Sequence, residues 1–255
     1  MAEIKYNKHI VTILVISTFI IVWIFATHGQ SIKADLIFPR PVLLLETLAN
    51  QYIQIIEYSL TTWYRVVVGL CIGSITGLVV AILMSYNKLF YFIFDPIIEI
   101  IRPIPPIALV PFFILWLGLG SLSQMLLISL GCFMIVTVSC YVGFTNVPPV
   151  YLKAAQSLGA SKIQLYRTVY IPAIIPGLIA GIRVALASSF ALTVAAEYLG
   201  AQGGLGYLIR NARQVLHTET ILLAAIILGI QSLVTDQIIR WIFGKFTKWQ
   251  SKLLS

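Results

Sequence analysis

Charged residues are scarce in this chain. Asp, Glu, Lys and Arg make up 10% of its 255 residues, 59% are hydrophobic, and the mean hydropathy is +0.96. Because a soluble globular domain carries about 25% charged residues, this composition excludes one. It predicts an all-α, polytopic membrane protein, and the length suits about six spans of roughly 20 residues in one membrane domain. We expect that domain to cover residues 1–255.

Motifs for metal, nucleotide and hydrolytic chemistry are also missing. The three cysteines, Cys71, Cys132 and Cys140, lie in apolar runs without metal-ligand spacing, so we interpret them as packing residues. No G-x4-G-K-[ST] phosphate loop occurs, and the three histidines are isolated. We therefore expect no enzymatic activity, no metal and no cofactor in this chain.

The net charge of +8 is concentrated between the apolar runs, so it indicates membrane orientation rather than nucleic-acid binding. The first run, residues 10–26, is longer than that of a signal peptide and lacks a cleavage motif, so we expect a retained span. The further spans are expected at residues 60–84, 89–118, 122–144, 174–198 and 221–243.

Both termini are then cytoplasmic, because ten basic residues lie inside and four outside. The inner ones are Lys5, Lys8, Lys88, Lys153, Lys162, Arg167, Arg240, Lys245, Lys248 and Lys252, and the outer ones are Lys33, Arg40, Arg210 and Arg213. Residues 42–57 are expected to form a separate amphipathic helix on the outer surface. In the second span, Gly69, Gly73 and Gly77 form a small-residue face for close helix contact.

Prolines interrupt the third span at Pro103, Pro105, Pro106 and Pro111. They free backbone groups at membrane depth, as in the broken helices that line transport routes. We therefore expect a translocation pathway beside Pro105 and Pro106; a kinked span packed against its neighbours is the alternative. Arg102 is the candidate cation of this pathway, unless it pairs with Asp95 or Glu99 at three- and four-residue spacing.

One face of the fifth span is polar, since Arg183, Thr193 and Glu197 recur at helical spacing. Ionisable residues inside a membrane indicate function, so we assign this polar face, with Arg183, Thr193 and Glu197, to the pathway. The alternative for Glu197 is that its side chain snorkels to a membrane interface. The stretch after this span is too polar to cross a membrane. Its glycines predict a turn into a short helix that carries Arg210 and Arg213 on one face.

The most informative stretch is the loop at residues 151–172, a polar and basic interruption between spans. Good helix formers end at Ser157, Gly159 supplies a positive φ, and Ser161 caps a second short helix that should end before Pro172. Such a unit lies at the membrane surface with one face free, as a partner site or as a basic loop that only fixes the topology.

This loop resembles the EAA loop of ABC importer permeases, E-A-A-x3-G-x9-I-x-L-P. The matching residues are Ala154, Ala155, Gly159 and Pro172, and Lys153 stands where the family has Glu. Three further runs are similar to permeases of the sulfonate, taurine and nitrate group. They are S-L-x4-R-V-x2-G at residues 59–69, R-P-I-P-P-I-A-L-V-P at 102–111 and A-E-x-L-G-A-x2-G-L-G-Y at 196–207.

The resemblance implies a type I ABC importer permease in a bacterial inner membrane. Its partners would be a second permease copy, expected as a homodimer, two ATP-binding subunits that hold ATP and Mg, and an extracytoplasmic solute-binding protein. Arg210 and Arg213 would lie on the side of the binding protein. The coupling loop would dock into a cleft on the ATP-binding subunit through Lys153, Ala154, Ala155, Ser157, Leu158, Gly159, Ala160, Lys162 and Pro172.

The implied substrate is a small organic anion, because R-P-I-P-P is closer to the sulfonate and taurine branch than to the nitrate and bicarbonate branch. Nitrate, bicarbonate or another small solute is the alternative. A gradient-driven transporter usually has related halves, which this sequence lacks. A structural scaffold would not need prolines and charges within its spans.

Overall fold

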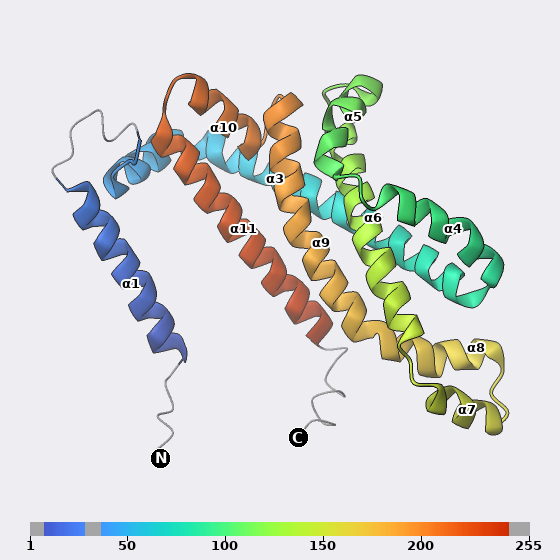
Figure 1. Cartoon of the computed structure of the whole chain (residues 1–255). Helices are drawn as coiled ribbons and strands as arrows, with labels where there is room; N and C mark the ends of the chain where they lie inside the picture. Colours follow the sequence, from blue (N-terminus) through green and yellow to red (C-terminus); the bar gives the residue numbers. More distant parts are fainter. Residues whose placement is uncertain (1–7, 29–36, 245–255) are drawn as a thin grey trace, which may run out of the picture.

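The structure is a computed structural model that describes residues 8–28 and 37–244, and every regular element in these ranges is a helix (Figure 1). Lys5, Lys33, Lys245, Lys248 and Lys252 of the predicted charge pattern lie outside the described residues. The elements are α1 (Lys8–Thr27), α3 (Pro41–Tyr86), α4 (Lys88–Ile101), η1 (Pro106–Leu109), α5 (Val110–Leu117), α6 (Ser121–Thr145), α7 (Pro149–Ser157), α8 (Lys162–Leu165), η2 (Tyr166–Tyr170), α9 (Ile171–Gly200), α10 (Leu205–Gln214) and α11 (Thr218–Gly244).

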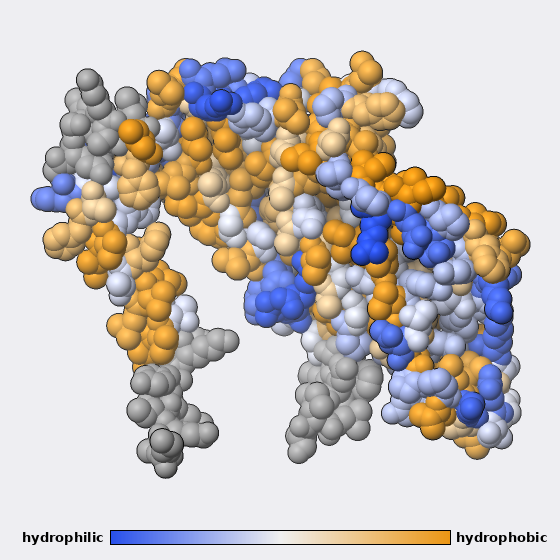
Figure 2. Space-filling view, viewed as in Figure 1, coloured by the Kyte–Doolittle hydropathy of each residue, from blue (hydrophilic) through white to orange (hydrophobic). Residues whose placement is uncertain are grey.

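Five helical stretches of the described chain are long and apolar enough to cross a membrane, and a bent pair, α4 with η1–α5, raises this to six. The predicted number of spans is confirmed. In Figure 1 the start of α1, the end of α11 and the α7–α8 hairpin lie toward the same end, and α5 and α10 lie toward the other. Figure 2 shows hydrophobic residues over most of α1 and along the exposed flank of α11, as expected for lipid-facing helices.

The second span begins much earlier than predicted. The amphipathic helix predicted at residues 42–57 is present but shorter, because α3 (Pro41–Tyr86) consists of two helices that meet at a kink at Gln51 (φ −122°, ψ 17°). No glycine or proline lies between Gln51 and Gly69 to end the helix. The boundary between the amphipathic helix and the second span therefore lies at Gln51, inside the predicted amphipathic segment.

The prediction of a second short helix that ends before Pro172 is also wrong. The chain is helical from Lys162 to Gly200, through α8, a π-helical turn at Tyr166–Tyr170 and α9. Pro172 occupies the first turn of α9, where a missing backbone N–H is tolerated. The loop thus joins the fifth span without a break.

The prolines of the third span do break its helix. The axes of α4 and η1–α5 differ by 84°. Pro106 and Pro111 occupy first-turn positions of η1 and α5, while Pro103 and Pro105 lie in the break. The broken span that the sequence predicts is confirmed.

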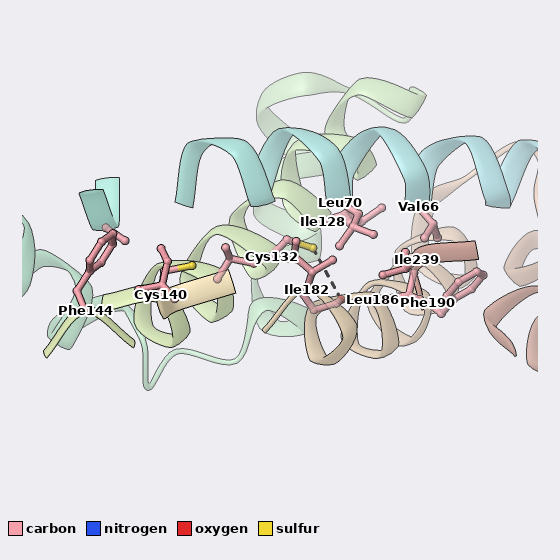
Figure 3. Packing of buried hydrophobic residues seen from close by; sticks show 14 of the residues in the cluster. Val66, Leu70, Ile128, Cys132, Cys140, Phe144, Ile182, Leu186, Phe190 and Ile239 are labelled. Atoms are coloured by element: carbon pink, nitrogen blue, oxygen red, sulfur yellow. Dashed lines mark hydrogen bonds between the residues drawn. The ribbon is translucent and has the colours of Figure 1, made fainter. Parts of the chain in front are cut away.

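The main core lies between α3, α6 and α9, with Ile239 added from α11 (Figure 3). The predicted glycine face packs on α6, where a Cβ at Gly73 would overlap the carbonyl oxygen of Ser129. Cys132 and Cys140 are buried in this core as predicted, whereas Cys71 is exposed.

Candidate functional site

The α7–α8 hairpin projects from one end of the helical bundle (Figure 1). Gly159 ends the turn with φ +79°, a conformation that favours glycine, and nothing lies within 4 Å of its Cβ position. Ser161 begins α8 with a capping box: Gln164 N donates to its hydroxyl (3.4 Å), and its own N–H donates to Gln164 Oε1 (2.7 Å).

The nine residues predicted for coupling lie together on this hairpin and at its entry into α9. Leu158 stands at the tip with 89% of its surface exposed, and Lys153, Ala154, Ser157 and Lys162 are exposed as well. Ala155, Ala160 and Pro172 are half-buried. A small apolar tip surrounded by polar residues is a surface that another protein can bind.

The base of the hairpin is attached to the end of α3, a contact that the sequence did not reveal. Lys162 Nζ donates to the Tyr86 carbonyl (3.0 Å) and lies 4.1 Å from the centre of the Tyr86 ring. The Tyr166 and Ser85 hydroxyls are 3.1 Å apart. Movement of the hairpin would therefore reach α3 as well as α9.

A cavity of about 590 Å³ lies between the broken span, α6 and α9. Among the described residues, Arg102 at the end of α4 is the one charged residue that lines it, and Pro106 lines it from η1. The hydroxyls of Ser139, Ser188 and Ser189 and the thiol of Cys132 add polar groups to a wall that is otherwise apolar. Such a site suits a small ligand with an anionic group.

Two other predicted pathway residues lie away from this cavity. Thr193 is fully buried in α9 and donates to the Ser189 carbonyl (2.7 Å), and Pro105 is exposed just before η1. The alternative pairing of Arg102 with Asp95 or Glu99 is absent: no ion pair among the described residues joins them. Since α4 ends at Ile101, Arg102 caps the helix and lines the cavity instead.

Arg183 lines a second cavity, of about 570 Å³, between α9 and α11. Its guanidinium binds Asp236 through Nε (2.7 Å), and Asp236 also binds Arg240 (2.7 Å). The side chains of Arg183 and Asp236 are 38% and 23% exposed. Sequence reasoning missed Asp236, although it is a lone acid in an apolar span.

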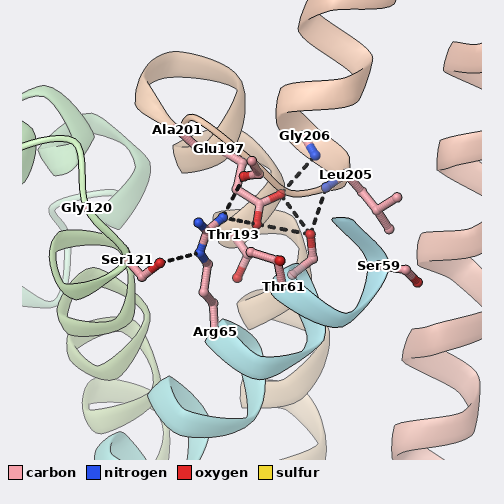
Figure 4. Close-up of polar contacts among 12 residues, drawn as sticks. Ser59, Thr61, Arg65, Gly120, Ser121, Thr193, Glu197, Ala201, Leu205 and Gly206 are labelled. Carbon is pink, nitrogen blue, oxygen red and sulfur yellow. Dashed lines mark hydrogen bonds and ion pairs between the residues drawn. The ribbon is translucent and has the colours of Figure 1, made fainter. Parts of the chain in front are cut away.

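Glu197 does not reach an interface, because its side chain is completely buried in an ion pair with Arg65 of α3 (Figure 4). Arg65 Nη1 lies 2.7 Å from Glu197 Oε1 and donates to the Gly203 carbonyl (2.8 Å), and Nε donates to Ser121 Oγ (3.1 Å). The pair therefore joins α3, α6, α9 and the turn before α10.

Backbone groups of that turn complete the cluster. Gly206 N donates to Glu197 Oε2 (2.9 Å), and Leu205 N donates to the Thr62 hydroxyl (2.8 Å), which itself donates to the carboxylate (2.9 Å). Gly204 has φ +108°, and a Cβ there would overlap the Glu197 carboxylate. These contacts fix the start of α10.

The predicted short helix with two arginines is confirmed as α10. Arg210 donates to the Ala201 carbonyl (3.1 Å), and its guanidinium lies 4.9 Å from the centre of the Tyr207 ring. Arg213 is exposed and donates to the Tyr198 hydroxyl. One face of α10 is thus basic at the end of the molecule opposite the hairpin.

Helices long and apolar enough to cross a membrane, cavities beside arginines and an exposed hairpin are features expected of a membrane transport protein. The chain belongs to the family of binding-protein-dependent transport system inner membrane components, whose model matches residues 69–248. It is therefore a multi-pass inner-membrane permease, as the loop resemblance predicted, and this family consists of transport proteins rather than enzymes.

Among curated relatives, the chain is 33% identical to the taurine transport system permease protein TauC of Escherichia coli K12. The match covers 74% of this chain and 69% of that protein. It is 29% identical to the putative aliphatic sulfonates transport permease protein SsuC of Bacillus subtilis, over 88% of this chain and 82% of that protein.

Solved structures confirm the fold. A chain of the inward-facing MetNI methionine ABC transporter gives a TM-score of 0.59 at 21% identity, covering 80% of this chain and 98% of that chain. A chain of an amino acid ABC transporter with histidines gives 0.62 at 20% identity, covering 78% and 97%. The fold is that of a type I ABC importer permease.

Proposed function

We propose that this chain is the permease subunit of an ATP-driven, binding-protein-dependent importer and forms the translocation pathway for an aliphatic sulfonate or taurine. The similarity to a taurine and a putative sulfonate permease supports this substrate group. Nitrate, bicarbonate or another small solute is the alternative substrate. Two copies of the chain would pair with two ATP-binding subunits, which hold ATP and Mg, and with an extracytoplasmic solute-binding protein.

The exposed α7–α8 hairpin carries this proposal. Its tip residue Leu158 is 89% exposed, and its base is attached to α3 and continuous with α9. A subunit that binds the tip of the hairpin could therefore move α3 and α9 together. In this arrangement the ATP-binding subunit docks on the nine residues from Lys153 to Pro172 named above, and the binding protein meets α10 near Arg210 and Arg213.

The transport route would follow α9, where the two cavities share Ser188. Arg102 and Pro106 line the first cavity, and Arg183 lines the second. An anion in a low-dielectric cavity needs compensating positive charge, which these arginines would supply. Thr193, Pro105 and Glu197 would support the walls of the route from outside the cavities.

The test is the Gly159→Trp change, measured by co-purification of a P-loop ATPase and by ATP hydrolysis of the complex. A bulky side chain at the tip should cost about 2 kcal/mol or more of docking free energy. We expect membrane insertion to persist and substrate-stimulated hydrolysis to be lost. Gly118→Trp is the matched control, because Gly118 also has positive φ (+80°) and open space, and it precedes α6 at the other end of the bundle.

Unaltered stimulation in the Gly159→Trp variant would remove the hairpin from the coupling role. Purification of the unmodified chain as an oligomer without any ATPase would instead favour a gradient-driven transporter.

A further inference from the structure

We infer that the cavity beside Arg102 is a binding subsite for a monoanion with a short alkyl chain, an aliphatic sulfonate in preference to a zwitterionic aminosulfonate such as taurine. This inference rests on the proposed function and deepens it, because it assigns the permease its own part in substrate choice. Four observations lead to it.

The first is that the two candidate arginines differ in charge balance. Arg183 is neutralised by Asp236 at 2.7 Å. Arg102 has no ion pair with any described residue, although it is the charged lining residue of its cavity. The first cavity therefore carries a net positive charge from its lining, and the second does not.

The second observation concerns hydrogen-bond donors. The Ser189 hydroxyl is occupied, since it donates to the Ala185 carbonyl at 2.6 Å. Ser188 and Ser139 line the same cavity, and neither hydroxyl bonds to a described residue. Two free hydroxyls and one guanidinium suit an oxyanion with several acceptor oxygens.

The third observation is the apolar wall. Isoleucine, leucine, methionine and valine side chains from the broken span, α6 and α9 form most of the lining, including Ile107, Met134 and Leu192. This surface suits a short alkyl chain, whose burial is favourable. With about 590 Å³, the cavity has room for such a molecule.

The fourth observation separates the two sulfonate types. None of the described residues that line the cavity is Asp or Glu. The ammonium group of an aminosulfonate would therefore lie in the same cavity as the Arg102 cation, with serine hydroxyls but no carboxylate to balance its charge. An alkyl monoanion avoids this cost, because burying an unpaired charge is unfavourable.

The experiment places a thiol at the cavity wall in the full chain, purified with its accompanying subunits and reconstituted in lipid nanodiscs. The parent carries Cys71→Ser, because Cys71 is exposed while Cys132 and Cys140 are buried. Ile135→Cys is added, because Ile135 lines this cavity and not the second one, and its labelling by an anionic and a cationic reagent is timed. The reagents are the 2-sulfonatoethyl and 2-(trimethylammonio)ethyl methanethiosulfonates, and the parent without Ile135→Cys gives the background.

We expect the anionic-to-cationic rate ratio to fall about five- to tenfold when Arg102→Gln is added. Butane-1-sulfonate should slow labelling, and taurine at the same concentration should slow it several-fold less. Ser232→Cys in the second cavity is the matched control, since Ser232 lies beside the neutralised Arg183–Asp236 pair. Its ratio should not respond to Arg102→Gln.

If the rate ratio at position 135 does not change with Arg102→Gln, or if the thiol there reacts with neither reagent, the anion subsite is overturned. Equal protection by taurine would overturn the preference for an alkyl monoanion. These labelling rates do not depend on ATP hydrolysis. A negative result would therefore overturn the subsite without overturning the importer function, which the Gly159→Trp experiment tests separately.

Discussion

Within the described residues, two ion pairs join different spans of this permease, and they differ in how exposed their side chains are. The side chains of Arg65 and Glu197 are 6% and 0% exposed, whereas those of Arg183 and Asp236 are 38% and 23% exposed. The buried pair is completed by Thr62, Ser121 and backbone groups of the turn before α10. The half-exposed pair has one further partner among the described residues, Arg240.

The difference shows what each pair contributes. A charge moved out of water is tolerated only when its remaining hydrogen-bonding capacity is met, as it is for Glu197. Its partners come from four elements, so the pair fixes their relative position. The half-exposed pair lines a cavity, and its further partner Arg240 lies on the same helix as Asp236. The pair therefore joins α9 and α11 alone and contributes less to stability.

The largest effect is expected from Arg65→Met, which leaves the Glu197 carboxylate buried without its cation. We expect the free energy of unfolding to fall by about 3–5 kcal/mol. The measurement is SDS-induced unfolding of the purified chain in mixed micelles.

The double variant Arg65→Met/Glu197→Leu is the control, since replacing both partners of a buried pair by apolar residues is often neutral. It should recover most of the loss. A single variant as stable as the unmodified chain would show that the pair does not hold these elements together.

A smaller effect is expected from Gly204→Ala, which tests the turn rather than the charges. The residue has φ +108°, and the added Cβ would overlap the Glu197 carboxylate. Such strain costs about 1–3 kcal/mol. The loss should appear in the same unfolding experiment, together with faster proteolysis near α10.

Gly229→Ala in α11 provides the contrast, because nothing lies within 4 Å of its Cβ position. Alanine should stabilise that helix by up to about 1 kcal/mol. Equal effects of the two changes would argue against a constrained turn at Gly204.

The sequence predicts the parts of this fold that depend on local pattern. Apolar runs locate the spans, prolines locate the broken helix, and Gly159 with Ser161 defines the hairpin. The start of the second span was misplaced, because the amphipathic helix ends at the kink at Gln51, where no glycine or proline marks its end in the sequence.

Contacts between distant residues could not be predicted in this way. Arg65 and Glu197 are 132 residues apart, and Arg183 and Asp236 are 53 apart. Helical spacing shows on which face of its own helix a charged residue lies, but it does not show which other helix that residue contacts. A signal was nevertheless present: Arg65 and Glu197 each lie in one of the motif runs at residues 59–69 and 196–207.

The smallest effect on stability is expected from Arg183→Gln. Because the Arg183–Asp236 pair is half-exposed, its loss should cost no more than about 1 kcal/mol. Asp236 keeps Arg240 at 2.7 Å, so no buried charge is left unpaired. Arg240→Gln serves as the matched control, and both variants should assemble normally.

In uptake assays Arg183→Gln should reduce transport less than Arg102→Gln, since only the charge of Arg102 is unbalanced in its cavity. A loss of stability as large as that of Arg65→Met would contradict the role of burial in separating the two pairs.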